Sequence, residues 1–62
     1  MIVKISSWDG KSMTTVKEQK VTTLDEIVNE MKWMNENDVH GSFDFISENE
    51  ADEMFLEGLK HN

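Results

Sequence analysis

The sequence predicts a small α+β domain: a two-layer sandwich of three antiparallel strands and two helices, in the order β-β-α-β-α. Three observations lead to this fold class. An alternating N-terminal segment runs into Asp9-Gly10, two capping boxes precede helical periods, and a short alternating run over 42–46 separates them. The chain is expected to be one domain, 1–62, near the lower size limit at which a hydrophobic core alone stabilises a fold.

The first two strands are expected to form a hairpin. Asp and Gly both tolerate the positive φ of a two-residue turn, so Asp9 and Gly10 are the predicted loop. The polar end of the second strand, 17–20, suits an exposed sheet edge, where lysines discourage further pairing. The predicted register places Val3, Ile5, Thr14 and Val16 on the buried face, and Ile2, Lys4, Trp8, Lys11, Met13, Thr15 and Lys17 on the open one.

The segment 23–34 is the predicted main core helix. Thr23 and Glu26 form a capping box, in which the Glu26 carboxylate reaches back to the Thr23 N–H. At about 100° per residue, Trp33 lies away from the apolar positions, on the outer face with Glu26, Asn29 and Glu30. The alternative is that its ring folds back over the final turn or onto the loop 35–40. The stripe expected to face the sheet is Leu24, Ile27, Val28, Met31 and Met34.

The alternating run Ser42–Ile46 is the third predicted strand. A second capping box, Ser47 to Glu50, starts a helix that extends to about Lys60, with His61 just beyond it near the negative end of the helix dipole. A right-handed crossover makes the third strand parallel to the second. Pairing with the first strand then gives the order 2-1-3, a wholly antiparallel sheet and both helices on one face. Pairing with the second strand is the alternative.

Composition argues against several kinds of site. The absence of cysteine excludes disulfides, and two histidines without cysteine do not suggest zinc, so no metal and no cofactor are expected. No nucleophile motif, phosphate-binding loop or HExxH motif occurs, and His40 is interpreted as a solvated turn residue, so we expect no enzyme activity. With neither a signal peptide pattern nor an apolar run of about 18 residues, a cytoplasmic location is expected.

The charge is distributed unevenly along the chain. The formal net charge is −7, yet residues 1–22 carry four lysines and only two acids, whereas residues 23–62 carry 11 of the 13 acids and two lysines. An acidic field of this kind repels nucleic acid and most membrane surfaces and attracts basic partners, so neither nucleic acid nor a membrane is an expected direct partner. The alternative is that the acids serve only solubility.

The leading hypothesis is a non-enzymatic inhibitor that occupies a basic, nucleic-acid-binding surface of a host protein. Rows of carboxylates along helices can imitate duplex phosphates, and an exposed Trp33 would anchor them. This general profile resembles the small acidic proteins that phages and mobile elements use to occupy basic surfaces of host enzymes. The predicted partner-binding residues are Asp25, Glu26, Glu30, Trp33, Glu50, Asp52, Glu53 and Glu57.

A second hypothesis concerns the bare face of the sheet. An apolar patch bordered by lysines usually marks an interface, and a short chain gains the most from a homodimer that seals it. The alternative function is therefore a homodimeric structural or regulatory subunit. Nucleic-acid stacking on this face is disfavoured by the net acidity and the absence of arginine. The predicted interface residues are Ile2, Trp8, Met13 and Ile46.

Overall fold

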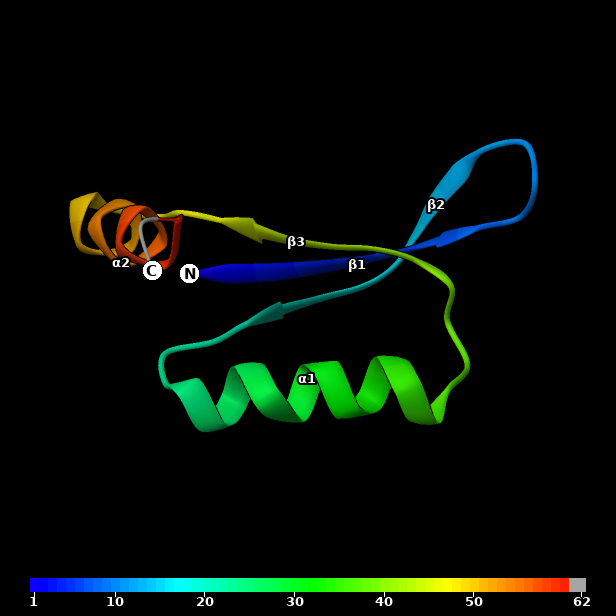
Figure 1. Ribbon diagram of the computed structural model, residues 1–62, viewed down its shortest axis with the longest axis horizontal. Helices are drawn as coiled ribbons and strands as arrows, with labels where there is room; N and C mark the ends of the chain where they lie inside the picture. The colour runs from blue at the N-terminus through cyan, green and yellow to red at the C-terminus, as the bar shows by residue number, and fades with distance from the viewer. Residues whose placement is uncertain (61–62) are drawn as a thin grey trace.

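The computed structural model describes residues 1–60, so the expectation for His61 lies outside the described residues. Three strands form one antiparallel sheet in the order β2-β1-β3, which confirms the predicted topology (Figure 1). The elements are β1 (Ile2–Trp8), β2 (Met13–Lys20), α1 (Leu24–Glu36), β3 (Gly41–Ile46) and α2 (Glu50–Lys60).

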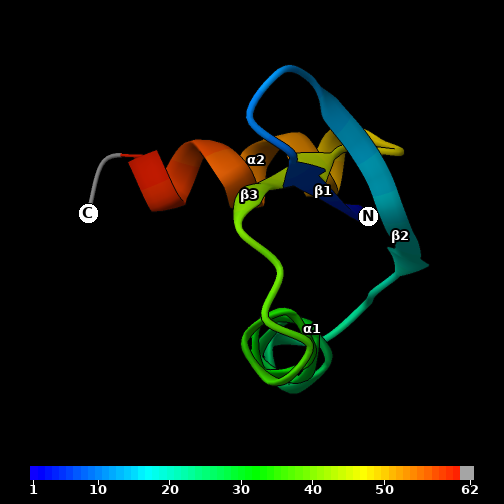
Figure 2. The same cartoon turned by 90° about the vertical axis from the view of Figure 1, so that its right-hand side faces the viewer.

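The helix α1 runs beneath one face of the sheet, and the hydrophobic core lies between the two (Figures 1 and 2). Alternation along β1 and β3 brings Val3 opposite Phe45 and Ile5 opposite Phe43. The two phenylalanine rings meet edge to face with their centroids 5.3 Å apart. The buried apolar side chains at the centre are Val3, Ile5, Val21 and Ile27.

The second helix occupies a different place from the first. α2 crosses the end of the sheet and projects past β3, as the view along the strands shows (Figure 2). Both helices are expected to cover one face of the sheet; α1 does so, whereas α2 reaches that face only at its margin. There Leu56 and Leu59 line a hollow with Phe43 and Phe45.

The hairpin loop is longer than predicted. Trp8 pairs with Met13, so the loop comprises residues 9–12, and the predicted two-residue loop is wrong. Asp9 Oδ1 accepts hydrogen bonds from the N–H groups of Ser12, at 2.9 Å, and Lys11, at 2.8 Å. Gly10 supplies the positive φ, 99°. The Ser12 and Lys11 N–H groups hold the pKa of the Asp9 carboxyl below its usual value.

A bulge in β2 changes which side chains face the core. The register of β1 and β2 shifts between Ile5 and Ser6, where Val16 has no partner. Lys17 lies opposite Ile5, and Val16 is 46% exposed. The prediction that Val16 is buried and Lys17 lies on the open face is therefore wrong. One extra residue in a strand exchanges the faces of all that follow it.

Both helices begin with reciprocal caps, although the partners differ in part from those predicted. Thr23 Oγ1 accepts from the Glu26 N–H at 3.2 Å, as expected, but the Glu26 carboxylate accepts from the Thr22 N–H, at 2.9 Å. Before α2, Asn49 Oδ1 accepts from the Asp52 N–H at 2.9 Å. The Asp52 carboxylate accepts in turn from the Glu48 N–H. The cap therefore lies two residues beyond the predicted Ser47.

The face that α1 turns to the sheet is also different. Ile27 and Glu30 are buried, and Trp33 and Met34 are half-buried. Three side chains of the stripe that was expected to face the sheet are exposed to solvent: Leu24, Val28 and Met31. The expected outward position of Trp33 and Glu30 is wrong because the Lys17 ammonium group lies between the sheet and α1, where it pairs with Glu30 and contacts the Trp33 ring.

Candidate protein-binding surfaces

The inner side of α1 holds a charged cluster. Lys17 Nζ lies 2.8 Å from Glu30 Oε1 and 3.0 Å from Oε2. The same ammonium group lies 4.5 Å from the centroid of the Trp33 ring, within the range of a cation–π contact. The Glu30 side chain is only 9% exposed. Glu30 and the half-buried Trp33 thus pack within the domain, and neither belongs to an outer surface of α1.

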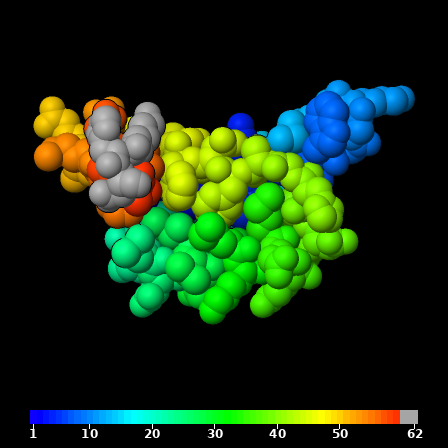
Figure 3. All heavy atoms as spheres, in the orientation of Figure 1, coloured from blue at the N-terminus to red at the C-terminus, as the bar shows by residue number. Residues whose placement is uncertain are grey.

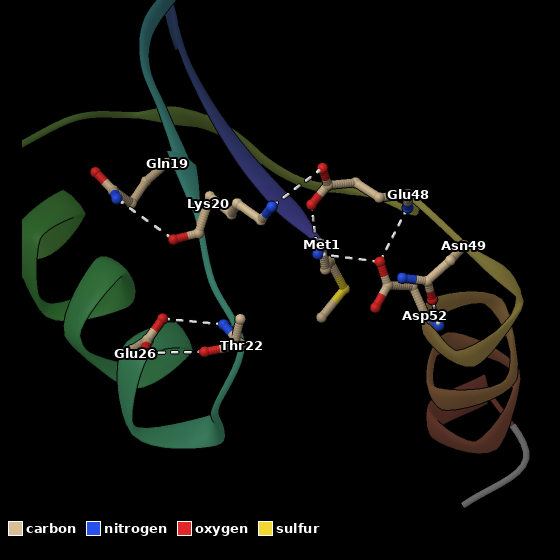
Figure 4. Close-up of polar contacts among 8 residues, drawn as sticks. All are labelled: Met1, Gln19, Lys20, Thr22, Glu26, Glu48, Asn49 and Asp52. Atoms are coloured by element: carbon tan, nitrogen blue, oxygen red, sulfur yellow. Dashed lines mark hydrogen bonds and ion pairs between the residues drawn. The ribbon is translucent and has the colours of Figure 1, made fainter.

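Two further predicted partner-binding acids are engaged within the chain, as Figure 4 shows. Glu26 caps α1 through Thr22. Asp52 Oδ2 lies 3.0 Å from the Met1 amino group, which also donates to Glu48 Oε1 at 2.7 Å. This cluster joins the start of β1 to the start of α2, and nothing in its sequence spacing predicted it.

The ion pairs of this cluster perturb its three titratable groups. The hydrogen bond to Glu48, followed by that to Asp52, raises the pKa of the Met1 amino group. The Met1 amino group lowers the pKa of Glu48. The pKa of Asp52 is lowered chiefly by the hydrogen bond from the Glu48 N–H and then by the Met1 amino group. Each charged form is therefore stabilised in the fold.

The remaining predicted acids lie on exposed helix surfaces. Asp25 is exposed in the first turn of α1. Glu50, Glu53 and Glu57 share one side of α2, where they line a shallow depression with Met54; these three acids are called the acidic stripe below. Met54 is 75% exposed. At about 100° per residue, the acidic stripe lies opposite the apolar side of α2, which carries Phe55 and Leu59.

The predicted dimer residues occupy the open face of the sheet in two separate pairs. Ile2 lies opposite Ile46 at one end, and Trp8 opposite Met13 at the other. Between the pairs, Lys4 lies opposite Glu18 on one neighbouring strand and Asp44 on the other. The open face is therefore apolar at its two ends and charged in its middle.

A hollow between α1 and the start of β3 was not predicted. Its volume is about 520 Å³, and its apolar wall consists of Met31, Met34, Val39 and Phe43. His40 lines it as well, with Nε2 3.0 Å from Asp38 Oδ1, and the side chains of both are more than 80% exposed. The interpretation of His40 as an exposed turn residue is confirmed.

Within residues 1–60, no group of three or more His, Asp or Glu side chains is arranged to hold a metal ion. No helix in that part of the chain is long and apolar enough to cross a membrane. No protein-family model, curated protein or solved structure matches the chain.

Proposed function

We propose that the chain is a non-enzymatic, cytoplasmic protein-binding module that docks the acidic stripe of α2 onto a basic, nucleic-acid-binding surface of a host protein. It inhibits that protein by occupying the surface, as a phage or mobile-element inhibitor would. The observation that carries the proposal is the position of the stripe on a helix that projects from the end of the sheet (Figure 2). Such a helix can reach into a concave partner surface.

The geometry of the stripe supports contact with a basic surface. Positions 50, 53 and 57 are spaced three and four residues apart, so their carboxylates follow one line along the helix. Met54 lies among them with 75% of its surface exposed, and it can supply the apolar contact that charges alone lack. In this proposal Met54 takes the anchoring role first expected of Trp33, which packs against Lys17.

Electrostatics favours association with a basic partner. The net charge of −7 speeds the encounter with a basic partner and makes complex formation depend on ionic strength. The fold uses four of the predicted partner-binding residues in a helix cap, ion pairs and a cation–π contact: Glu26, Glu30, Trp33 and Asp52. The proposed contact surface is therefore smaller than the sequence alone suggested.

The proposal is tested by competition with nucleic acid. Basic proteins from a lysate of the source organism are captured on the chain, purified, and mixed with a labelled DNA duplex. We expect the chain to displace the duplex at 50 mM salt. In a separate measurement without DNA, its own binding to the captured protein should weaken between 50 mM and 200 mM salt by about tenfold or more.

Matched variants locate the surface. Glu50→Gln/Glu53→Gln/Glu57→Gln should abolish displacement. The control Glu18→Gln/Asp25→Asn/Glu36→Gln, which removes the same charge from exposed positions outside α2, should retain most of it. Equal losses in the two variants would reject a specific role for α2. Capture without displacement of the duplex would reject inhibition by occupancy.

A further inference from the structure

The two edges of the sheet differ in how they resist pairing with another strand. The β2 edge carries the bulge at Val16 and the lysines Lys17 and Lys20, which are features that block edge-to-edge association. The β3 edge, Gly41–Ile46, has no lysine and no proline, and its register with β1 is unbroken. An edge without such protection is a template for another strand.

One backbone hydrogen bond shows which N–H and C=O groups of β3 face its open edge. The Trp8 N–H donates to the His40 carbonyl at 2.7 Å, so His40 directs its backbone groups toward β1. Successive residues of an antiparallel strand direct their backbone groups to opposite neighbours, so Ser42 and Asp44 also direct theirs toward β1. The N–H and C=O groups of Gly41, Phe43 and Phe45 therefore point away from the sheet, along its open edge.

We propose that the chain forms a symmetric homodimer in which the β3 strands of two copies pair antiparallel and join the two sheets into one of six strands. Phe43 lies opposite Phe43 of the second copy, and Gly41 opposite its Phe45, which provides about six main-chain hydrogen bonds. Asp44 then lies opposite the Ser42 hydroxyl. The neighbouring register would place two Asp44 carboxylates directly opposite each other, which is unfavourable.

The same pairing gives α2 an apolar partner. Antiparallel strands place the end of one β3 beside the start of the other. α2 follows the end of β3, and the hollow walled by Met31, Met34, Val39 and Phe43 lies at its start. Each α2, which projects past β3 (Figure 2), is thereby brought to the hollow of the second copy. The side of α2 that carries Phe55, Leu56 and Leu59 then faces the hollow of the second copy, and the acidic stripe stays exposed to solvent.

Surface area agrees with a second copy as the occupant. The accessible surface of 4659 Å² is roughly 500 Å² larger than that of a compact monomer of 7.2 kDa, about 4,100 Å². A stable dimer removes about 800 Å² from each copy. Figure 3 shows the region concerned: β3 lies uncovered above α1, with α2 standing at its end. The apolar side chains there that are more than a third exposed include Met31, Phe55 and Leu59.

The first test is the solution mass by light scattering at low and high salt. We expect twice the chain mass of 7.2 kDa at both salts, because the interface is a backbone and apolar one. A monomer at concentrations on the order of 1 mM would overturn the proposal. The outcome is independent of the proposed function, which depends on salt and on the acidic stripe.

Matched substitutions on α2 test its placement. Leu59→Gln should weaken dimerisation on the order of a hundredfold, because each dimer contains the change twice. Met54→Gln, on the opposite side of the same helix, should change it less than about twofold. An unchanged dimer with Leu59→Gln would contradict the proposal. So would a monomer produced by Trp8→Gln, since that residue belongs to the open face of the sheet.

Cysteine pairing tests the register, because the chain contains no cysteine. Ser42→Cys and Asp44→Cys are oxidised separately and as a mixture. The proposed register predicts a disulfide in the mixture and none in either alone, since residues 42 and 44 of different copies face each other at a distance that a disulfide spans. Glu18→Cys, on the β2 edge, is the control and should not cross-link. Cross-linking of Asp44→Cys with itself would overturn this register, and no cross-link through β3 would overturn the interface.

Discussion

Lys17 of β2 and Glu30 of α1 form an ion pair beneath the sheet, with Nζ 2.8 Å from Oε1 and 3.0 Å from Oε2. Only the contact with Oε2 has hydrogen-bond geometry, and the buried Oε1 accepts no hydrogen bond. The ammonium group also lies over the Trp33 ring. This contact fixes the rotation of α1, because a buried carboxylate needs its cation on the same side.

Removal of the cation should destabilise the fold. Lys17→Met leaves the Glu30 carboxylate buried without a partner, and we expect a loss of about 1–3 kcal/mol in the free energy of unfolding. The measurement is urea denaturation at a fixed protein concentration. Lys17→Met/Glu30→Leu should recover most of the loss, because it removes both charges together. Additive losses would contradict this account of the pair.

Gly41 should not tolerate a side chain. A Cβ at this position would overlap the backbone carbonyl of Ser6, which the sheet cannot move without breaking its register. Gly41→Ala is expected to cost at least about 2 kcal/mol of stability, measured by chemical denaturation. The control is Gly58→Ala in α2, where nothing lies within 4 Å, and it should increase stability by up to about 1 kcal/mol. Equal effects of the two substitutions would show that the close approach is unimportant.

The backbone of Asp38 predicts a stabilising substitution. Asp38 has a φ of 55° in the turn between α1 and β3, a conformation that glycine adopts without strain. Its contact with His40 is exposed and contributes little. Asp38→Gly should raise the free energy of unfolding by about 0.5–1 kcal/mol in thermal denaturation. Asn37→Gly, where φ is −93°, should give no such gain.

The Met1, Glu48 and Asp52 cluster predicts a stability maximum across neutral pH. The Met1 amino group has a raised pKa in the fold. Its contribution to the free energy of unfolding is therefore complete below its ordinary pKa of 8.0 and is lost as pH rises through its pKa in the folded state. The Glu48 and Asp52 carboxyl groups have lowered pKa values in the fold. Their contribution to stability is therefore present above their ordinary pKa values, 4.5 for Glu48 and 3.8 for Asp52, and is lost as pH falls through their pKa values in the folded state.

Urea titrations across pH test this cluster. Glu48→Gln/Asp52→Asn should reduce both the acid and the alkaline loss of stability, because the amino group loses its partners as well. The control Glu53→Gln, an exposed acid of the same helix, should leave the profile unchanged. A wild-type profile without an alkaline decline would mean that the amino group gains no stability from its partners in solution.

The sequence by itself determined the order of the elements and favoured, without deciding it, the order of the strands. The helical period after Thr23 predicted α1 to within two residues, and the alternation of 42–46 predicted β3 to within one. These are local signals, because capping and periodicity depend on neighbours in the chain. Crossover handedness and the lysine-rich edge of β2 favoured a place for β3 beside β1, but pairing with β2 stayed open until the structure showed the order β2-β1-β3.

Only the tertiary structure decided which side chains face inward. The bulge at Val16 placed Lys17 between the sheet and α1. Lys17 there holds Glu30 and Trp33, which a hydrophobic pattern assigns to solvent, on the inner side of the helix. The Met1 amino group likewise engaged Asp52 across 51 positions of sequence. Pairing between distant charges is set by three-dimensional proximity, which no local pattern encodes. The acids proposed to contact a partner are therefore ones whose side chains remain exposed in the folded chain.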